Sequence, residues 1–310
     1  MLPEHPTSGY CDLQGRRPTI EDFHSIHLKH DHQFYGMFDG HTGNLASKFA
    51  ASELYGELMR RLPNLENMLT TSKSEGEGVI GDEKYSWKED IRINITQAFE
   101  YVHDQFLDRI TTMTSPIVEV GTAPNMDQSG TTATAILVTD NMIIAATLGD
   151  SRAIISHSSK NPWKDFPSVS AVQFSIDHVA SHPTERDLVI ERGGFVSASG
   201  GIPRVNGILA VTRSIGDADL APVLSREPHV LVLDRSEIRE LCGSLASDGL
   251  WDVMSNQEAV DMVVDIILRE NMEMYDAADG PFQEAAERLA VEAYVRGSTD
   301  NIGVCVVAVD

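Results

Sequence analysis

The stretch TATAILVTDNMIIAATLGDSRAIIS, residues Thr132–Ser156, indicates the fold class most directly. It contains three runs rich in Ala, Ile, Val and Thr, separated by two short polar segments: Thr132–Val138, Met142–Leu148 and Ala153–Ser156, with Thr139-Asp140-Asn141 and Gly149-Asp150 between them. Such runs, bounded by Gly, Asp or Asn, are typical of strands in the interior of a sheet. Because turns this short join antiparallel neighbours, the stretch predicts a three-stranded antiparallel meander.

Strand and helix patterns continue on both sides of this stretch, in separate blocks. Further strand-like runs are Gln33–Phe38, Gly207–Val211, Val230–Leu233, Cys242–Ala246 and Ile302–Val309. Apolar residues recur at helical spacing in Ala46–Leu58, in Ile91–Ile110, after a capping box of Ser255 and Glu258, and in Pro281–Arg296. Separate blocks predict an α+β fold, with antiparallel sheets and helices outside them. No linker divides the chain, so we expect a single domain over residues 1–310, with surface loops at Asn67–Trp87, Thr111–Ser129 and His157–Ser168.

Composition excludes several classes of function. The chain has 310 residues and a formal net charge of −23, which argues against general affinity for nucleic acid or anionic membranes. No apolar run approaches the length of a membrane-spanning helix, and the first residues lack the features of a signal peptide. Cys11, Cys242 and Cys305 are too few and too scattered for a disulfide framework. We expect a monomeric protein that is intracellular, either cytoplasmic or nuclear.

Four acids stand at the ends of predicted strands. Asp39, Asp150 and Asp248 each follow a strand, and Asp300 precedes the last one. Because strand ends meet at sheet edges, several of these carboxylates can converge. Two carboxylates 4 Å apart repel by about 4 kcal/mol at an effective dielectric constant near 20, so a cluster needs protons or cations. Each acid alone is better explained as a turn or cap residue, but together they favour a site for a hard ion such as Mg²⁺, Mn²⁺ or Ca²⁺.

Two other side chains, each beside acids in the sequence, are candidates for a role in the reaction. His41 follows Asp39 by two residues, which makes it a candidate proton donor. Arg17 precedes Glu21 and Asp22, and its guanidinium can hold a phosphate with two parallel hydrogen bonds. An ion pair between Arg17 and Glu21 explains the same spacing, and the spacing does not choose between the two.

Taken together, the motifs resemble the PPM (type 2C) family of metal-dependent serine/threonine protein phosphatases. The matching segments are Gln14–Asp22, Phe38–Gly43, Ser129–Ala133, Gly149–Arg152, Asp177-His178, Gly193-Gly194, Arg204–Gly207, Ala210–Asp217, Ser247–Asp252 and Gly297–Asn301. The resemblance extends from about Gly9 to Val309. It implies a central β-sandwich of two antiparallel sheets flanked by helices, a binuclear metal site at one end, and hydrolysis of phosphoserine and phosphothreonine monoesters in phosphoprotein substrates.

The resemblance also implies a role for each matched residue. Asp39 would bridge two Mg²⁺ or Mn²⁺ ions; Glu21 and the carbonyl of Gly40 would help hold one, and Asp248 and Asp300 the other. Asp150 matches a position that helps to bind a weaker third ion. Asp22 and Asp252 would orient metal-bound waters or Arg17, Arg17 would grip the substrate phosphate, and His41 would be the general acid. A water between the two cations would attack phosphorus.

Two departures from the family pattern are visible. Ile20 stands where the family usually has Met, a conservative change. Val179-Ala180 follow His178 where a Lys is common, so the resemblance carries no substrate contact to that position.

Two rival functions remain. Cys11 and Arg17 have the Cys-x5-Arg spacing of cysteine-dependent phosphatases, but Asp12 lies where backbone amides should meet an anion, and Pro18 follows the arginine. The other rival is a catalytically inactive scaffold that keeps the fold and binds partner proteins. Against it, every matched metal position with a side-chain ligand carries an acid.

Overall fold

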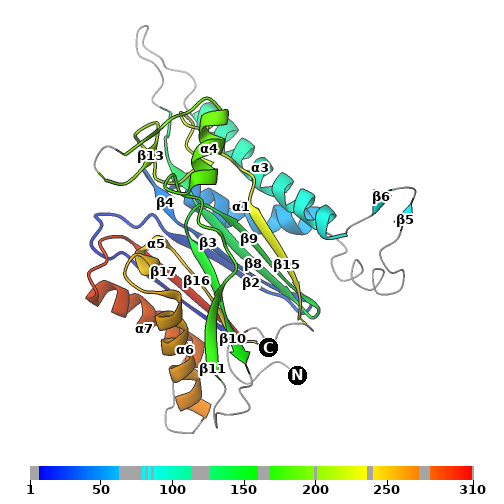
Figure 1. Ribbon diagram of the computed structural model, residues 1–310, viewed down its shortest axis with the longest axis vertical. Coiled ribbons are helices and arrows are strands. Elements are labelled where there is room, and N and C mark those ends of the chain that lie inside the picture. The colour runs from blue at the N-terminus through cyan, green and yellow to red at the C-terminus, as the bar shows by residue number, and fades with distance from the viewer. Residues whose placement is uncertain are drawn as a thin grey trace.

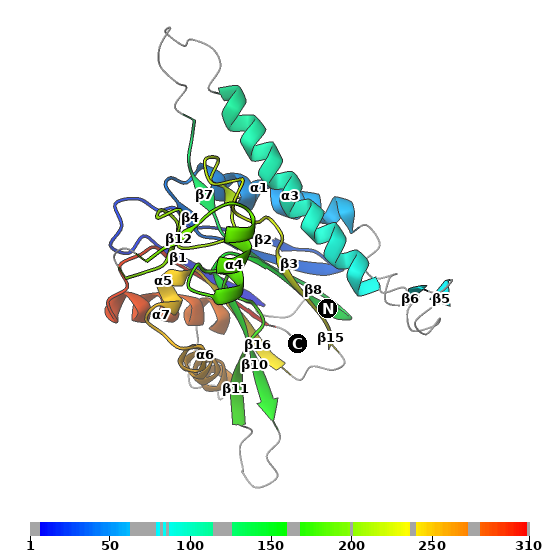
Figure 2. The ribbon, with the colours of Figure 1, turned by 45° about the horizontal axis from the view of Figure 1, so that its top comes forward.

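The computed structural model describes residues 7–62, 79–80, 83–84, 87–113, 126–159, 168–198, 201–235, 240–271 and 280–308. Two five-stranded antiparallel sheets pack face to face, with helices on both outer sides (Figures 1 and 2). The first sheet has the order β1 (Ser8–Leu13), β17 (Ile302–Ala308), β16 (Glu240–Ala246), β10 (Arg152–Ser159) and β11 (Ser168–Gln173). The second has the order β15 (His229–Asp234), β9 (Met142–Leu148), β8 (Ala133–Thr139), β3 (His32–Phe38) and β2 (Phe23–Leu28). The predicted α+β sandwich is confirmed.

Helices cover the two outer faces. The helices α1 (Leu45–Arg61) and α3 (Trp87–Met113) lie on the second sheet, and α6 (Asn256–Asn271) and α7 (Pro281–Val295) lie on the first. Shorter elements gather at one end: α4 (Pro183–Glu191), α5 (Asp248–Trp251), β12 (Val196–Ser197) with β13 (Arg204–Val205), and a small sheet of β14 (Ile215–Gly216), β7 (Gly130–Thr131) and β4 (Gly40–His41). A separate hairpin joins β5 (Val79–Ile80) and β6 (Glu83–Lys84).

Alternation along the strands builds three apolar layers. In β3, Phe34 and Phe38 point to the helices α1 and α3, whereas Tyr35 and Met37 lie in the layer between the two sheets. This follows from the two-residue period of a strand. Because strands such as β3, β8 and β9 are covered on both faces, their sequences are continuously apolar rather than alternating.

The helix predictions are confirmed. Before α6, the backbone N–H of Ser255 donates to Oε2 of Glu258 at 2.9 Å, and the N–H of Glu258 donates to Oγ of Ser255 at 3.4 Å. This is the predicted capping box. The last helix, α7, begins at Pro281 and is followed by Gly297, whose φ of 101° ends the helical conformation.

The predicted three-stranded meander is wrong in its third strand. β8 and β9 pair as expected, but β9 has β15 on its other edge, and β10 pairs with β16 and β11 in the opposite sheet. Gly149 adopts a φ of 100°, and there the chain leaves one sheet for the other. A strand covered on both faces has the same apolar pattern in either sheet, so the sequence does not specify which sheet it joins.

Other boundaries differ as well. Gly207–Val211 forms no regular strand; its residues take part only in the isolated bridges Val205↔Leu209 and Val179↔Val211. The strands β2 and β11 are additional to the predicted runs. The helix α3 continues to Met113, so the predicted loop from Thr111 starts later. Most of the three predicted loops lies outside the described residues. No helix in the described ranges combines the length and apolar character needed to cross a membrane.

Alanine substitution at two glycines should change the free energy of unfolding in opposite directions. A Cβ on Gly9 in β1 would overlap the backbone of Gln283 in α7, whereas a Cβ on Gly56, on the exposed side of α1, would meet nothing within 4 Å. Gly9→Ala should lower the free energy of unfolding by about 1–3 kcal/mol because helix backbone cannot yield locally. Gly56→Ala should raise it by about 0.5–1 kcal/mol. Denaturant titration of both variants measures this, and a Gly9→Ala variant as stable as the wild type would contradict the packing of α7 on β1.

Candidate metal centre

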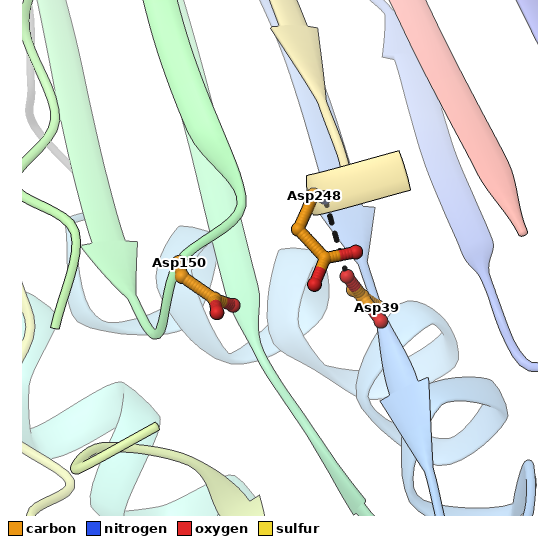
Figure 3. A group of neighbouring side chains, drawn as sticks. All are labelled: Asp39, Asp150 and Asp248. Atoms are coloured by element: carbon orange, nitrogen blue, oxygen red, sulfur yellow. Dashed lines mark hydrogen bonds between the residues drawn. The ribbon is translucent and has the colours of Figure 1, made fainter. Parts of the chain in front are cut away.

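Three carboxylates meet at one end of the sandwich. Asp39 follows β3, Asp150 lies in the turn between β9 and β10, and Asp248 begins α5 after β16. One carboxylate oxygen from each lies within 4.8 Å of the others (Figure 3). The backbone N–H of Asp248 also lies 3.5 Å from Oδ2 of Asp39. Asp39 belongs to one sheet, Asp248 follows a strand of the other, and Asp150 lies where the chain crosses between them.

Glycines allow the backbone to pack tightly around these acids. A Cβ on Gly40 would overlap the carbonyl oxygen of Glu21 and would lie 2.6 Å from Oγ of Ser47. A Cβ on Gly249 would overlap the carbonyl oxygen of Asn301. The glycines that follow Asp39 and Asp248 are therefore required by close approach of the backbone.

Ionising these carboxylates in the folded protein costs free energy. Desolvation, and then the charges of neighbouring acids, raise the pKa of Asp39 and of Asp150 well above the usual value. Desolvation and the nearby charge of Asp300 raise the pKa of Asp248 to about 6. Desolvation raises the pKa of Asp22 to about 7, against the effect of a hydrogen bond with Ser247.

The donor set fits a hard divalent cation. In the described part of the chain, no lysine or arginine forms an ion pair with Asp39, Asp150 or Asp248. Beside them, Oδ2 of the buried Asp22 has no hydrogen-bond partner. A group of oxygen ligands that no lysine or arginine contacts in an ion pair is the environment that Mg²⁺ or Mn²⁺ prefers.

The other predicted ligands lie outside this group of three. Oε1 of Glu21 accepts the N–H of Gly43 at 3.0 Å. Oδ1 of Asp300 accepts hydrogen bonds from Nε of Arg17 and from the N–H of Asn301, each at 2.7 Å. Asp252 is exposed at the C-terminal end of α5. Asp150, which the family resemblance assigns to a weaker ion, lies within the tightest group.

Arg17 makes an ion pair, but with Asp300 rather than with the Glu21 that spacing suggested. The contact uses Nε, and the side chain remains 44% exposed. Its terminal nitrogens make no hydrogen bond to the residues that the structure describes. Asp300 thus holds one edge of the Arg17 guanidinium, while the terminal nitrogens stay available to a phosphate.

His41 contacts a residue to which sequence reasoning gave no role. Nε2 of His41 lies 2.9 Å from both carboxylate oxygens of Asp217. The two residues are 176 positions apart and are brought together because β4 and β14 both pair with β7. In the sequence, Asp217 is only the last residue of the matching segment Ala210–Asp217, and no spacing signal links it to His41.

Comparison with known proteins assigns the chain to a family. Residues 7–302 match the family model described as "Protein phosphatase 2C", and the chain belongs to that family. The family is metal-dependent, and the group of Asp39, Asp150 and Asp248 is an acidic cluster that could bind metal.

Two curated relatives and a solved structure show the extent of the similarity. "Probable protein phosphatase 2C 11" from Arabidopsis thaliana is 32% identical over 303 residues, which cover 96% of this chain and 65% of that protein. "Probable protein phosphatase 2C 59" from the same organism is 31% identical over 303 residues, covering 96% and 78%. The "Crystal structure of serine-threonine phosphatase 2C from Toxoplasma gondii" shares the fold with a TM-score of 0.75 at 20% identity, covering 97% and 94%. The chain therefore spans just under two thirds of the first relative's length.

The raised pKa values predict how metal-free protein responds to pH. The pKa of Asp22 and of Asp248 rises from 3.8 to about 7 and about 6 on folding. The stability that protonation of these groups provides is therefore full below about pH 4 and is lost as the pH rises through about 6 to 7. With a chelator, the melting temperature should fall across this window relative to protein with saturating Mg²⁺, because the ions bind the ionised carboxylates.

The quantity to compare is the melting temperature as a function of pH, measured once with chelator and once with saturating Mg²⁺. Burial lowers the pKa of His103 to about 4 and of His178 to about 3, which acts in the opposite direction and equally in both samples. Parallel pH profiles with and without chelator would mean that no cation binds these acids.

Proposed function

We propose that this chain is a metal-dependent protein serine/threonine phosphatase that hydrolyses phosphoserine and phosphothreonine monoesters with Mg²⁺ or Mn²⁺. The observation that carries the proposal is the group of Asp39, Asp150 and Asp248, each with one carboxylate oxygen within 4.8 Å of the others and, among the described residues, none in an ion pair with lysine or arginine. Membership of the protein phosphatase 2C family and the printed names of the relatives support it.

Two cations per chain are proposed, with a weaker third. Asp39 would contact both of the first two; Glu21 and the carbonyl of Gly40 would complete one site, and Asp248 and Asp300 the other. Asp150 would help to hold the third ion, and its carboxylate lies in the same group as those of Asp39 and Asp248. When bound, the cations lower the pKa of water and neutralise charge on the phosphoryl oxygens.

The chain's own side chains would bind, orient and protonate the substrate. Arg17 would hold the phosphate through its terminal nitrogens, while Asp300 fixes the plane of the guanidinium at Nε. Asp22 and Asp252 would orient water. As the oxygen of water bonds to phosphorus, the P–O bond to serine or threonine breaks, and His41 gives a proton to the departing oxygen.

The surroundings of Cys11 count against cysteine-dependent chemistry. The residue lies in β1, and burial, with the charges of Asp12 and Glu287, raises its pKa to about 11. A thiol with a raised pKa is a poor nucleophile at neutral pH. Arg17, the other half of the Cys-x5-Arg pattern, is paired with Asp300.

The wider setting is part of the same proposal. We infer one catalytic domain over residues 1–310, since side chains from both sheets share one apolar layer. The substrates would be phosphoproteins, and the net charge of −23 leaves no role for nucleic acid. A monomer in the cytoplasm or nucleus remains the working expectation.

Asp39→Asn tests the proposal. The wild type should hydrolyse a phosphothreonine peptide with Mn²⁺, lose this activity in a chelator and keep it after thiol alkylation. The variant should lose on the order of 10³-fold or more in kcat, because metal assistance contributes several kcal/mol. It should also gain much less thermal stability from Mn²⁺ than the wild type.

Asp140→Asn is the matched control. Asp140 is exposed in the turn between β8 and β9, so its variant should behave as the wild type in both measurements. A well-folded wild type that binds Mn²⁺ but hydrolyses no phosphopeptide would favour the inactive scaffold. Activity that resists the chelator would contradict the metal mechanism.

A further inference from the structure

Asp217 presents a nearly buried carboxylate to His41. The exposed fraction is 6% for the Asp217 side chain and 19% for that of His41, and Nε2 lies 2.9 Å from Oδ1 and from Oδ2. The hydroxyl of Ser214 donates to Oδ2 at 2.5 Å. Among the described residues, no lysine or arginine forms an ion pair with Asp217, and its carboxylate contacts the imidazole of His41 and the hydroxyl of Ser214 instead.

The backbone around this pair is shaped for the contact. In the small sheet, His41 lies opposite Gly130, and Gly130 lies opposite Gly216. A Cβ on Gly130 would overlap both Nε2 of His41 and Oδ2 of Asp217, so only glycine leaves room for the contact. Asp217 itself has a φ of 52°, a conformation that side-chain-bearing residues seldom adopt, and its N–H donates to the carbonyl of Ser129 at 3.0 Å.

We propose that Asp217 is a positioning residue for His41 in the phosphatase reaction, a role that rests on the function proposed above. An ionised carboxylate only accepts hydrogen bonds, so Nε2 of His41 carries the hydrogen that faces Asp217. The ring orientation is thereby fixed, and Nδ1 is the nitrogen left to serve the substrate. As the P–O bond to the serine or threonine oxygen breaks, the proton on Nδ1 passes to that oxygen, and the hydrogen on Nε2 stays with the ring.

Asp217 could instead serve only to hold its turn, through Ser214 and Ser129. Comparing two substrates with different leaving groups distinguishes the two roles. A serine or threonine oxygen leaves poorly and needs a proton, whereas para-nitrophenolate leaves without one. Loss of positioning therefore slows hydrolysis of a phosphothreonine peptide far more than hydrolysis of para-nitrophenyl phosphate. Loss of the turn slows hydrolysis of both substrates alike.

Asp217→Asn is the first test, because asparagine keeps the size of the side chain and tolerates positive φ. On the phosphothreonine peptide, kcat should fall by about 10- to 100-fold, less than the roughly 10²–10⁴-fold that an acid catalyst contributes. On para-nitrophenyl phosphate the loss should be several-fold smaller. In a His41→Gln background, Asp217→Asn should have little further effect. Asp219→Asn, two residues away and exposed, is the matched control and should match the wild type.

Equal losses on both substrates, or losses that multiply in the double variant, would overturn the positioning role. Should Asp217→Asn fail to fold, nuclear magnetic resonance of ¹⁵N-histidine-labelled wild type with Mg²⁺ decides, with His41 assigned by comparison with His41→Gln. Neutral His41 should carry its hydrogen on Nε2, and a hydrogen on Nδ1 would overturn the proposal. A wild type inactive on both substrates would refute the proposed function, while this spectrum still tests the contact between His41 and Asp217.

Discussion

Repulsion among the carboxylates of Asp39, Asp150 and Asp248 is the constraint around which the rest of the structure is organised. One oxygen of each lies within 4.8 Å of the others, none of the three forms an ion pair with a lysine or arginine in the described part of the chain, and desolvation adds to the cost of their charge. An arrangement of this kind persists only if the surrounding fold holds it and protons or cations compensate its charge. Three apolar layers supply the rigidity. Bound cations, as proposed, would supply the compensating charge and would let a chain of net charge −23 attract a phosphate.

The site depends on how the two sheets meet at one end of the sandwich. Asp150 is placed by the crossing from β9 to β10, and a buried network supports that turn: Nδ1 of His178 accepts the N–H of Gly149 at 3.2 Å. Nearby, Glu185 in α4 accepts hydrogen bonds from Thr212 and Arg213 at 2.7 and 2.6 Å. Although burial opposes it, hydrogen bonding to Arg213 and Thr212 lowers the pKa of Glu185 to about 2. The elements around α4 are thus fixed to the turn that carries Asp150.

The sequence predicts local features well and distant pairings poorly. Apolar periodicity located α1, α3, α6 and α7, and the acids at strand ends indicated where three carboxylates would meet, because both signals are carried by neighbouring residues. It could not assign β10 to a sheet, since strands covered on both faces share one pattern. It also placed a strand at Gly207–Val211, where the structure has only isolated bridges. The contact of His41 with Asp217 depends on β4, β7 and β14, each two residues long and too short for periodicity to reveal.

Anomalous X-ray scattering from crystals grown with Mn²⁺ tests the central claim most directly, because it locates the metal without reference to activity. The account predicts manganese peaks within coordination distance of Asp39 and Asp248, with Asp39 contacting two of them, and a weaker peak beside Asp150. Asp22 should lie behind these ions without contacting them. Crystals that contain Mn²⁺ at full occupancy elsewhere but show no anomalous density between Asp39 and Asp248 would contradict it.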